Sequence, residues 1–551
     1  MSDPTAPSPP ARSAEPSTRR AAGIVGVAVI VSRLLGLIRE QVFAAMFGAG
    51  KLLDVYLAAF QIPNLLRDLF AEGALSVAFT TLFTKSWEED GEASAWEFAQ
   101  LILTAMIILM GLVSVAGVVG SPLLVEVTNF GFHHVPGKFE LAVRMTRILF
   151  PFILFVSLAA AVMGMLNARG RFAVPASASS VFNLVSVIAG VGLAFAFDAG
   201  ARAHPLHPHF TVNALYGVTM GVLLGGVAQL GMQLPSLWRL GFTFRWRPAL
   251  SDPRLKALWA LMWPSVVAGA AVQVNVLVNG MFASGINGGR SWLACAFRLM
   301  QLPIGLFGVS LATVTLPSVA RAFSRGDTAA FGATAKDSLR LAFFLTLPAA
   351  AGLAALAHPI IEVIYQHGAF SARDTSMTAF ALQAYALGLA GYAAIKVLVP
   401  CFYALGLPKT PLRISLIGIG INLALNLFNY DVLHLGHVGL AVTTSAVALI
   451  NFAQLLFALK RRIDLGTTAQ WAGYLGRCIL AAAICGGAAF ALWSALDPRA
   501  HGLGLRMGAL GLAVAAGALA YFAAARLVGL QEGHEAWELF RHRLLGALRP
   551  A

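Results

Sequence analysis

An apolar stretch from Ser32 to Ser76 carries side chains that do not belong in hydrocarbon: Arg33, Arg39, Asp54, Arg67, Asp68 and Glu72. An arginine at the centre of a bilayer helix costs about 2.5–3.5 kcal/mol on insertion scales. A chain that keeps such residues therefore turns them toward a water-filled cavity. Because arginine dominates the set, the stretch predicts a cavity for an anionic substrate.

The rest of the chain has the composition of a polytopic membrane protein. Of its 551 residues, 58% are hydrophobic and 12% are charged, whereas a soluble domain has about 25% charged residues. About fourteen hydrophobic stretches are each long enough to cross roughly 30 Å of hydrocarbon as a helix. They begin near residue 22 and end near residue 529. We therefore expect an all-α integral membrane protein with about fourteen transmembrane helices.

The formal net charge of +14 is distributed unevenly over the loops. If the stretches alternate in direction, most loop arginines and lysines fall on one side. The other side holds little beyond Lys51, Lys138, Arg202, Arg290, Arg373 and Arg499. The positive-inside rule then predicts that both termini are cytoplasmic, in a multi-pass protein of the inner membrane. No compact basic domain is present, so a nucleic-acid partner is not expected.

Two motifs recur at nearly the same spacing. Gln61-Ile62-Pro63 matches Gln301-Leu302-Pro303, 240 residues later, and Ala168-x-Gly170-x-x-x-x-Pro175 matches Ala404-x-Gly406-x-x-x-x-Pro411, 236 residues later. Chance is the alternative, because glycine and proline are common here. The echoes predict two parallel six-helix halves, a recurrent transporter plan. We expect a disordered cytoplasmic tail (1–21), an N-lobe (22–235), a C-lobe (255–459), two C-terminal helices (470–530) and a second cytoplasmic tail (531–551).

Four intramembrane arginines are the candidate substrate contacts: Arg33, Arg39, Arg67 and Arg298. Arg33 and Arg39 lie six residues apart, about 120° apart around a straight helix, unless a bend at Gly36 brings them together. Arginine presents planar donors that match phosphate oxygens. The set therefore favours a pyrophosphate in the cavity.

Other interpretations of these charges remain open. The arginines could pair internally with Glu40, Asp54, Asp68 or Glu72, or extend to the membrane surface from the ends of spans. Lys396, Gln301 and Asn64 are further candidates for the cavity lining. No nucleophile or metal motif is present, and all four cysteines fall in predicted spans. We expect no enzyme activity, no cofactor and no metal.

Several segments resemble one known family, the MurJ/MviN lipid II flippases of the MOP exporter superfamily. The similar segments are Ser32–Glu40, Phe47–Gly50, Pro63–Ser76, Phe297–Ser310, Tyr365–Gly368 and Lys396–Ala404. The resemblance implies fourteen helices in two lobes around a cationic cavity, and a groove for the polyprenyl tail at residues 470–530. It places Arg33, Arg39, Arg67 and Arg298 in the cavity, with Asp54 and Glu72 as acidic positions that partner them between conformational states. Phe297 and Gln301 stand where the family often has acidic residues.

The expected function is therefore transport in cell-wall and peptidoglycan synthesis, which maintains cell shape. The substrate would be lipid II, an undecaprenyl-pyrophosphate-linked disaccharide peptide, moved to the periplasmic leaflet by alternating access. Membrane lipids and cell-wall synthesis proteins are the expected partners. The alternatives are export of another lipid-linked glycan, a drug or cation antiporter of the same superfamily, and an enzyme acting on polyprenyl phosphates.

Overall fold

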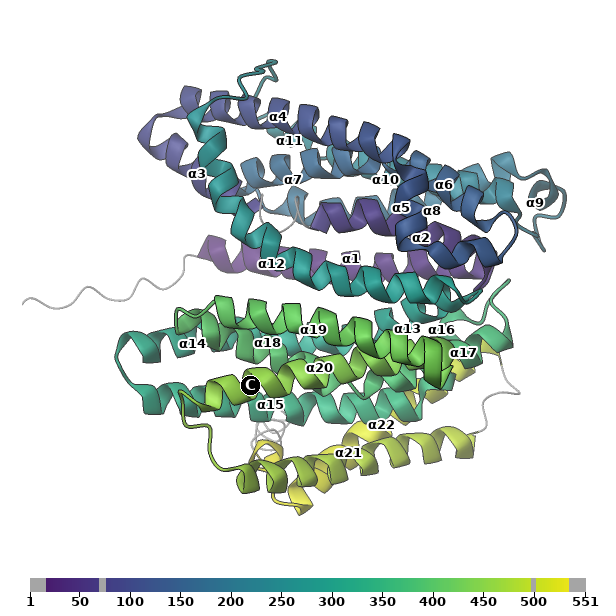
Figure 1. Cartoon of the computed structure of the whole chain (residues 1–551), viewed down its shortest axis with the longest axis vertical. Coiled ribbons are helices and arrows are strands. Elements are labelled where there is room, and N and C mark those ends of the chain that lie inside the picture. Colours follow the sequence, from purple (N-terminus) through teal and green to yellow (C-terminus); the bar gives the residue numbers. More distant parts are fainter. Residues whose placement is uncertain (1–15, 69–75, 497–501, 535–551) are drawn as a thin grey trace, which may run out of the picture. The chain divides into compact units, whose positions relative to one another are not determined.

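The structure is a computed structural model that describes residues 16–68, 76–496 and 502–534, and within these every regular element is a helix (Figure 1). Side chains are described except at 16–22, 24, 76–77, 264–265, 267–268 and 271–272. The chain divides into two compact units: unit 1 comprises 1–42, 59–122 and 143–269, and unit 2 comprises 43–58, 123–142 and 270–551. Segments 43–58 and 123–142, from the expected N-lobe, thus belong to unit 2.

Five helices contain a boundary between the units: α1 (Pro16–Phe47), α2 (Lys51–Arg67), α5 (Ser121–Thr128), α6 (Lys138–Leu149) and α12 (Pro253–Ser284). Helix α1 begins inside the segment 1–21 that we expected to be disordered. Pro16 suits the first position of a helix, because its fixed φ is helical and its missing N–H would have no partner there. The first helix therefore begins at residue 16 and not near residue 22 as expected, while residues 1–15 lie outside the described residues.

Unit 1 is completed by α3 (Ser76–Glu89), α4 (Glu92–Val119), α7 (Phe152–Ala168), α8 (Ala173–Phe197), α9 (Ala199–Ala203), α10 (Val212–Gly231) and α11 (Leu234–Trp238). Helices α8 and α10 lie against each other because glycines line their contact. A Cβ atom added at Gly221 would lie 2.3 Å from the backbone of Gly190. Small residues let membrane helices approach this closely. Aromatic rings fill the core between α3 and α4, where Phe79 and Phe98 stack with ring centroids 5.9 Å apart.

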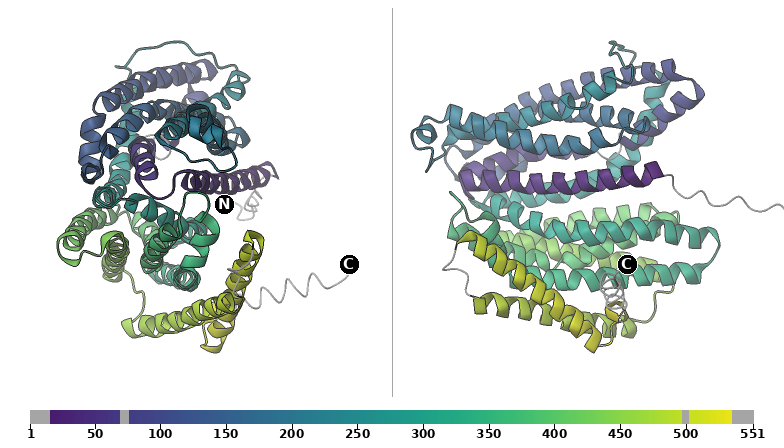
Figure 2. Two further views of the ribbon diagram at one scale, coloured as in Figure 1. Left: turned by 90° about the vertical axis from the view of Figure 1, so that its right-hand side faces the viewer. Right: turned by 180° about the vertical axis from the view of Figure 1, so that it is seen from behind.

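Unit 2 contains the remaining elements, with two π-helical segments, η3 and η4, where spans are interrupted. They are η2 (Phe130–His134), α13 (Gly289–Pro303), η3 (Ile304–Val309), α14 (Ser310–Ser324), α15 (Thr328–Ala355), α16 (Ala357–Tyr365), α17 (Ala372–Ala386), α18 (Leu389–Ala404), α19 (Lys409–Phe428), η4 (Asn429–Leu433), α20 (Gly436–Lys460), α21 (Thr468–Leu496) and α22 (Leu503–Leu527). Helices α21 and α22 pack against each other and cross at an angle, as the left view of Figure 2 shows.

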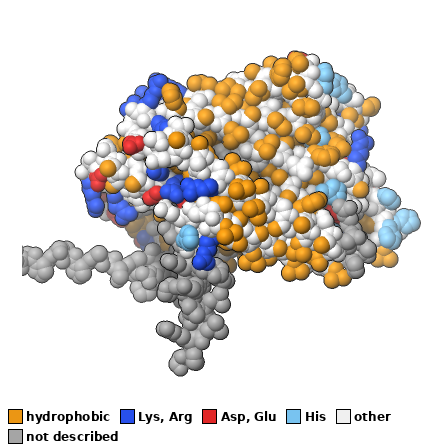
Figure 3. All heavy atoms as spheres, turned by 90° about the horizontal axis from the view of Figure 1, so that it is seen from below, with side chains coloured by type: hydrophobic (Ala, Val, Ile, Leu, Met, Phe, Trp, Pro, Cys, Tyr) orange, Lys and Arg blue, Asp and Glu red, His pale blue; other side chains and the backbone are white. Residues whose placement is uncertain are grey.

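Ten helices among the described residues are long and apolar enough to cross a membrane, and the pair α17 and α18, bent by 44°, makes up to eleven. They coincide with eleven of the fourteen expected stretches. Helices α1 and α12 cover two others, and the last falls on α2, α3 and the segment 69–75, which is not described. Hydrophobic side chains form a broad field on the face in Figure 3, with lysine and arginine gathered at one side. Such a field suits contact with lipid.

The second pair of sequence echoes has one local structure at both places. Helices α7 and α18 end at Ala168 and Ala404, and each is followed by a glycine with positive φ, +69° at Gly170 and +71° at Gly406. In both turns the next N–H group donates back into the helix, from Arg171 to Leu166 and from Leu407 to Phe402. Because L residues avoid positive φ, glycine is required at both turns.

Candidate functional site

Helix α1 positions the first two candidate arginines in different surroundings. The helix is continuous through Gly36, so Arg33 is exposed whereas Arg39 is buried. A Cβ atom at Gly36 would lie 3.5 Å from the amide nitrogen of Asn183 on α8. That amide donates to the carbonyl of Ser32 at 3.2 Å. Gly36 therefore gives room for helix packing, and the rotation of about 120° per six residues keeps the two arginines apart.

The Arg39 guanidinium lies between aromatic rings of unit 1. Its Cζ atom is 5.5 Å from the ring centroid of Phe60 on α2 and 5.1 Å from that of Phe182 on α8. Phe152 packs against both rings, with centroids 5.6 and 5.5 Å away. Such rings attract a cation by their quadrupole. They accept no conventional hydrogen bond, so this environment leaves much of the guanidinium's donor capacity unused.

The hydrogen bonds of Arg39 are incomplete. Its Nε and Nη1 atoms are buried and have no hydrogen-bond partner among the described residues. The carboxylate of Glu40 lies 3.9 Å from Nη2, at the outer limit for an ion pair. A buried donor without a partner costs about 1–3 kcal/mol. This cost would be relieved if an anion were bound.

Arg67 ends helix α2 with a close carboxylate partner. Its Nε and Nη2 atoms donate to Oδ1 of Asp68 at 3.2 and 2.9 Å. Both side chains are partly exposed. Internal pairing, one of the two interpretations that the sequence left open, is therefore present at Arg67. Asn64 is half-buried one turn earlier on α2, and Glu72 lies outside the described residues.

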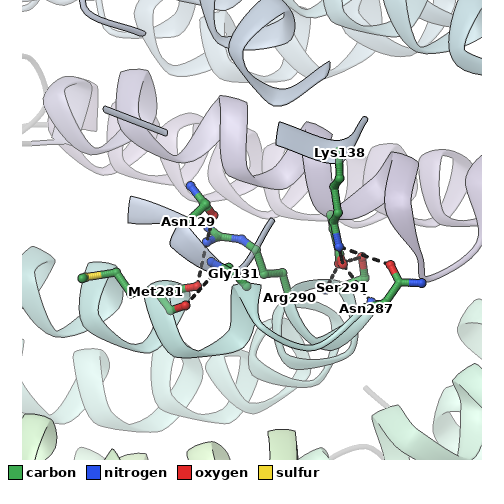
Figure 4. Close-up of polar contacts among 11 residues, drawn as sticks. Asn129, Gly131, Lys138, Met281, Asn287, Arg290 and Ser291 are labelled. Atoms are coloured by element: carbon green, nitrogen blue, oxygen red, sulfur yellow. Dashed lines mark hydrogen bonds and ion pairs between the residues drawn. The ribbon is translucent and has the colours of Figure 1, made fainter. Parts of the chain in front are cut away.

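Asp54, at the start of α2, has a fully buried side chain in a polar cluster of unit 2, and three other members of this cluster, Lys138, Asn287 and Ser291, are labelled in Figure 4. We define the Asp54 cluster as Asp54, Lys138, Asn287, Gly288 and Ser291. Oδ2 of Asp54 accepts from Lys138 Nζ at 2.7 Å and from Gly288 N at 2.8 Å. Oδ1 accepts from Ser291 N at 2.9 Å and from Ser291 Oγ at 2.6 Å. Lys138 also donates to Asn287.

The partners explain why a carboxylate is stable there. Gly288 and Ser291 lie at the N-terminus of α13, where free backbone N–H groups and the helix dipole favour negative charge. Lys138, the first residue of α6, supplies a counter-charge with both side chains 0% exposed. The cluster therefore joins the start of α2, the start of α6 and the start of α13.

Further bonds surround the cluster within unit 2. Arg290 donates to the side chain of Asn129 (Figure 4) and to the Gly280 carbonyl. Lys51 donates to the Pro136 carbonyl at 2.6 Å. The sequence alone predicts that Lys51, Lys138 and Arg290 lie in loops. A sequence signal was nevertheless present, because these are three of the few basic residues on the side where positive charge is otherwise scarce.

The remaining candidates lie on exposed parts of unit 2. Arg298 and Gln301 are exposed on α13, three residues apart and so on one helix face. Lys396 is exposed on α18, beside Gly308 of η3. Phe297 contacts Tyr385, with ring centroids 5.4 Å apart. An aromatic contact therefore stands beside Arg298 at a position where the resemblance implies an acidic group.

The chemistry available at these sites is that of binding. Within the described residues, no group of three histidine, cysteine, aspartate or glutamate side chains could hold a metal ion. In unit 1, the Arg39 guanidinium has two nitrogen atoms without a hydrogen-bond acceptor among the described residues. In unit 2, both carboxylate oxygens of Asp54 accept hydrogen bonds from the protein. The arrangement at Arg39 suits binding of an anion from outside the protein. The arrangement at Asp54 suits a stable structural interaction within unit 2.

Comparison with known proteins gives a consistent result. Residues 43–518 match the model of the family described as lipid II flippase MurJ. A probable lipid II flippase MurJ of Rhizobium tropici is 34% identical over 509 residues, which are 92% of this chain and 93% of that protein. The lipid II flippase MurJ of Burkholderia cenocepacia is 34% identical over 464 residues, 83% of this chain and 87% of its own.

Solved structures show the same relationship. A lipid II flippase MurJ in an inward closed conformation superposes with a TM-score of 0.74 at 25% identity, covering 91% of this chain and 98% of that one. A multidrug resistance MATE family transporter of the MOP superfamily, in an inward-facing conformation, superposes with a TM-score of 0.66 at 14% identity. It covers 80% of this chain and 98% of its own, and at that identity shows similarity of fold alone.

Proposed function

This chain belongs to the MurJ family of lipid II flippases, and from that premise we propose that it carries lipid II from the cytoplasmic to the periplasmic leaflet by alternating access. A member of this family transports and catalyses no chemical reaction. The pyrophosphate of the substrate would bind to arginine side chains, Arg39 first among them. Arg33, Arg67 and Arg298 are the further contacts in this proposal.

The observation that supports the proposal is the state of Arg39. A buried cation with two N–H-bearing atoms lacking acceptors is poorly stabilised by the protein alone. Phosphate oxygens are strong acceptors that pair with guanidinium in a bidentate manner. The aromatic rings of Phe60 and Phe182 hold the guanidinium without occupying its donors. Binding would therefore complete a hydrogen-bond set that the protein leaves open.

The Asp54 cluster is a candidate for the interaction that stabilises one conformation during the transport cycle. By the positive-inside rule its loops would lie at the periplasmic end, and we propose that the cluster keeps that end closed while the headgroup enters from the cytoplasm. Asp54 would thus set conformation, with Lys138 as its partner. We assign the same conformational role to Glu72 on the basis of the family resemblance.

The full architecture in this proposal has fourteen helices, as two six-helix lobes in parallel repeat followed by α21 and α22. The two equivalent turns at Gly170 and Gly406 support the repeat, since both their positive φ and their hydrogen bonds agree. The small-residue faces of α21 and α22 would form the groove for the polyprenyl tail. Both termini would be cytoplasmic.

The test is rescue of a bacterial strain depleted of its own flippase, together with the leaflet distribution of lipid II. We expect wild-type protein to restore growth and to expose lipid II to an enzyme added on the periplasmic side. Arg39→Ala should abolish both, and Arg39→Lys should restore part, because a point charge remains but bidentate geometry is lost.

The matched control is Arg461→Ala. Arg461 also lies over a phenylalanine ring, with its Cζ atom 4.3 Å from the centroid of Phe457, but it is exposed beyond the end of α20. This variant should rescue growth fully. Full rescue by Arg39→Ala at normal expression would overturn the proposed role of Arg39. Lipid II that remains on the cytoplasmic leaflet in the presence of wild-type protein would overturn the proposed transport of lipid II.

A further inference from the structure

An apolar pocket of about 330 Å³ lies in unit 1, and neither Arg39 nor the rings around it are among its lining residues. Its walls come from the middle of α4, from Ser157 of α7, and from the first three turns of α12 with the preceding Leu250. Twelve of its thirteen lining residues are hydrophobic, among them Met106, Leu109, Leu258 and Met262. The volume is at the lower end of the range of about 300–1,000 Å³ for small-molecule sites.

The pocket opens on a surface suited to lipid. Leu112 and Trp259, both in its wall, are 67% and 39% exposed. Nearby Trp246 and Trp263 are 54% and 61% exposed, and exposed tryptophan is typical of the boundary between hydrocarbon and water. A hydrocarbon chain can therefore enter from the bilayer without crossing a polar barrier.

Basic side chains stand at the end of the pocket formed by Leu250 and Leu255. Arg247 pairs with Glu97, and Arg254 pairs with Asp252 at 2.8 Å. Arg245 and Lys256 are exposed and have no ion pair within the described part of the chain. Four cations face three carboxylates at this end, because Asp90 also acts electrostatically on Arg254 in addition to the paired Glu97 and Asp252, and one net positive charge remains. Because Lys256 adjoins Leu255 of the pocket wall, a bound chain and its anionic headgroup can be held together.

We propose that this pocket binds one acyl chain of an anionic membrane phospholipid, whose phosphate pairs with Arg245 and Lys256. Because α12 forms part of the pocket wall, binding of a lipid in the pocket would also affect the orientation of this helix. Helix α12 starts in unit 1 and passes into unit 2 at residues 269 and 270. A lipid packed against its first turns would bias the orientation of a helix shared by both units. The inference does not depend on the identity of the transported substrate.

The experiment uses purified full-length protein in phosphatidylcholine vesicles with or without phosphatidylglycerol. A trace of phosphatidylglycerol carrying a photoreactive group in its acyl chain is activated, and labelled peptides are mapped by mass spectrometry. We expect labelling within residues 102–112 and 255–262. A phosphatidylcholine probe of the same chain should label these peptides much less.

Two variants separate the pocket from the charge. Ala105→Trp fills the pocket and should remove the labelling, whereas Ala515→Trp, which adds the same bulk to an exposed face of α22, should not. The double substitution R245Q and K256Q should lower labelling by the anionic probe about fivefold for each cation removed, the loss expected near an anionic lipid surface. Arg325→Gln, an exposed control in unit 2, should change nothing.

Three results would overturn the proposal. One is the absence of labelling in both segments, and another is equal labelling by the two phospholipid probes. The third is displacement of the label by a polyprenyl phosphate but not by phosphatidylglycerol, which would assign the pocket to the tail of a polyprenyl substrate. If Ala105→Trp fails to fold, the charge variants and the two probes still decide the outcome.

Discussion

Two buried charges, Arg39 in unit 1 and Asp54 in unit 2, have opposite hydrogen-bond states. Asp54 accepts four hydrogen bonds at 2.6–2.9 Å and has Lys138 as counter-ion. Arg39 has two nitrogen atoms without an acceptor among the described residues, and the Glu40 carboxylate lies 3.9 Å from its third nitrogen. Burial alone therefore does not tell whether a charge stabilises the fold. The number of hydrogen bonds that the protein itself supplies does.

This difference separates a structural charge from one available to a ligand. A saturated carboxylate has nothing left to offer a substrate, and its removal should cost stability. An unsaturated guanidinium contributes little to stability, and its removal should cost binding. The substitutions below test this distinction, in order of their expected cost in free energy of unfolding.

The largest effect is expected for Lys138→Met. It leaves the Asp54 carboxylate buried without its counter-ion, which should lower the free energy of unfolding by about 3–5 kcal/mol. Thermal or denaturant unfolding of the purified protein measures the loss. Adding Asp54→Asn to the same protein removes the stranded charge and should recover part of the stability. A double variant no more stable than Lys138→Met would show that charge is not what the cluster requires.

A smaller loss is expected for Ser291→Ala. The substitution removes the hydroxyl that donates to Asp54 at 2.6 Å but keeps the backbone N–H donor of the same residue. One hydrogen bond to a charged group contributes about 1.5–3 kcal/mol. Ser177→Ala is the control, because its exposed hydroxyl only bonds within α8. Equal unfolding midpoints for the two variants would refute the role of the hydroxyl.

The sequence identified the candidate arginines better than it identified the hydrogen-bond partners of Asp54. Arg33, Arg39, Arg67 and Arg298 were recognisable because charge in an apolar stretch is unexpected in a membrane. Asp54 was recognisable for the same reason, but the partners that the sequence suggested were arginines. Its actual partner, Lys138, lies 84 residues away in a segment that has the composition of an ordinary loop. Local patterns carry no information about such a long-range contact.

Helices were predicted more reliably than their ends or their burial. Eleven expected stretches coincide with apolar helices because hydropathy over a long window is a strong signal. The break at η3, after Pro303, agrees with the loss of a backbone donor at proline. Whether Gly36 bends α1 or accommodates Asn183 depends on the neighbouring helix. The sequence of α1 alone cannot decide it.

A third buried charge, the Asp198 carboxylate in unit 1, tests whether hydrogen bonds suffice where the described residues supply no ion pair. Burial raises the pKa of Asp198, but bonds from Thr211, Gly200 and Ala201 outweigh it and lower the pKa below its ordinary value of 3.8. The folded state thus favours the ionised form, so this stabilisation is complete above pH 3.8 and is lost as the pH falls through the folded pKa.

Asp198→Ala should therefore cost about 0.5–2 kcal/mol near neutral pH, as for other N-cap residues, and less in acid. Unfolding midpoints measured from neutral pH to below 3.8 should converge for the variant and the wild type. Asp337→Asn controls for the loss of one exposed negative charge. A difference that stays constant with pH would show that ionisation of Asp198 is not what stabilises this turn.

The smallest change in stability, with the largest change in function, is expected for Arg39→Met. Methionine keeps much of the apolar contact with Phe60 and Phe182 and removes the nitrogen atoms that lack acceptors. The loss of attraction to the rings, about 0.5–2 kcal/mol, opposes the gain of about 1–3 kcal/mol from removing unsatisfied donors. The unfolding midpoint should stay close to that of the wild type while growth rescue is lost. A strongly destabilised Arg39→Met would mean that the protein satisfies this guanidinium by itself, and the contrast with Asp54 would then disappear.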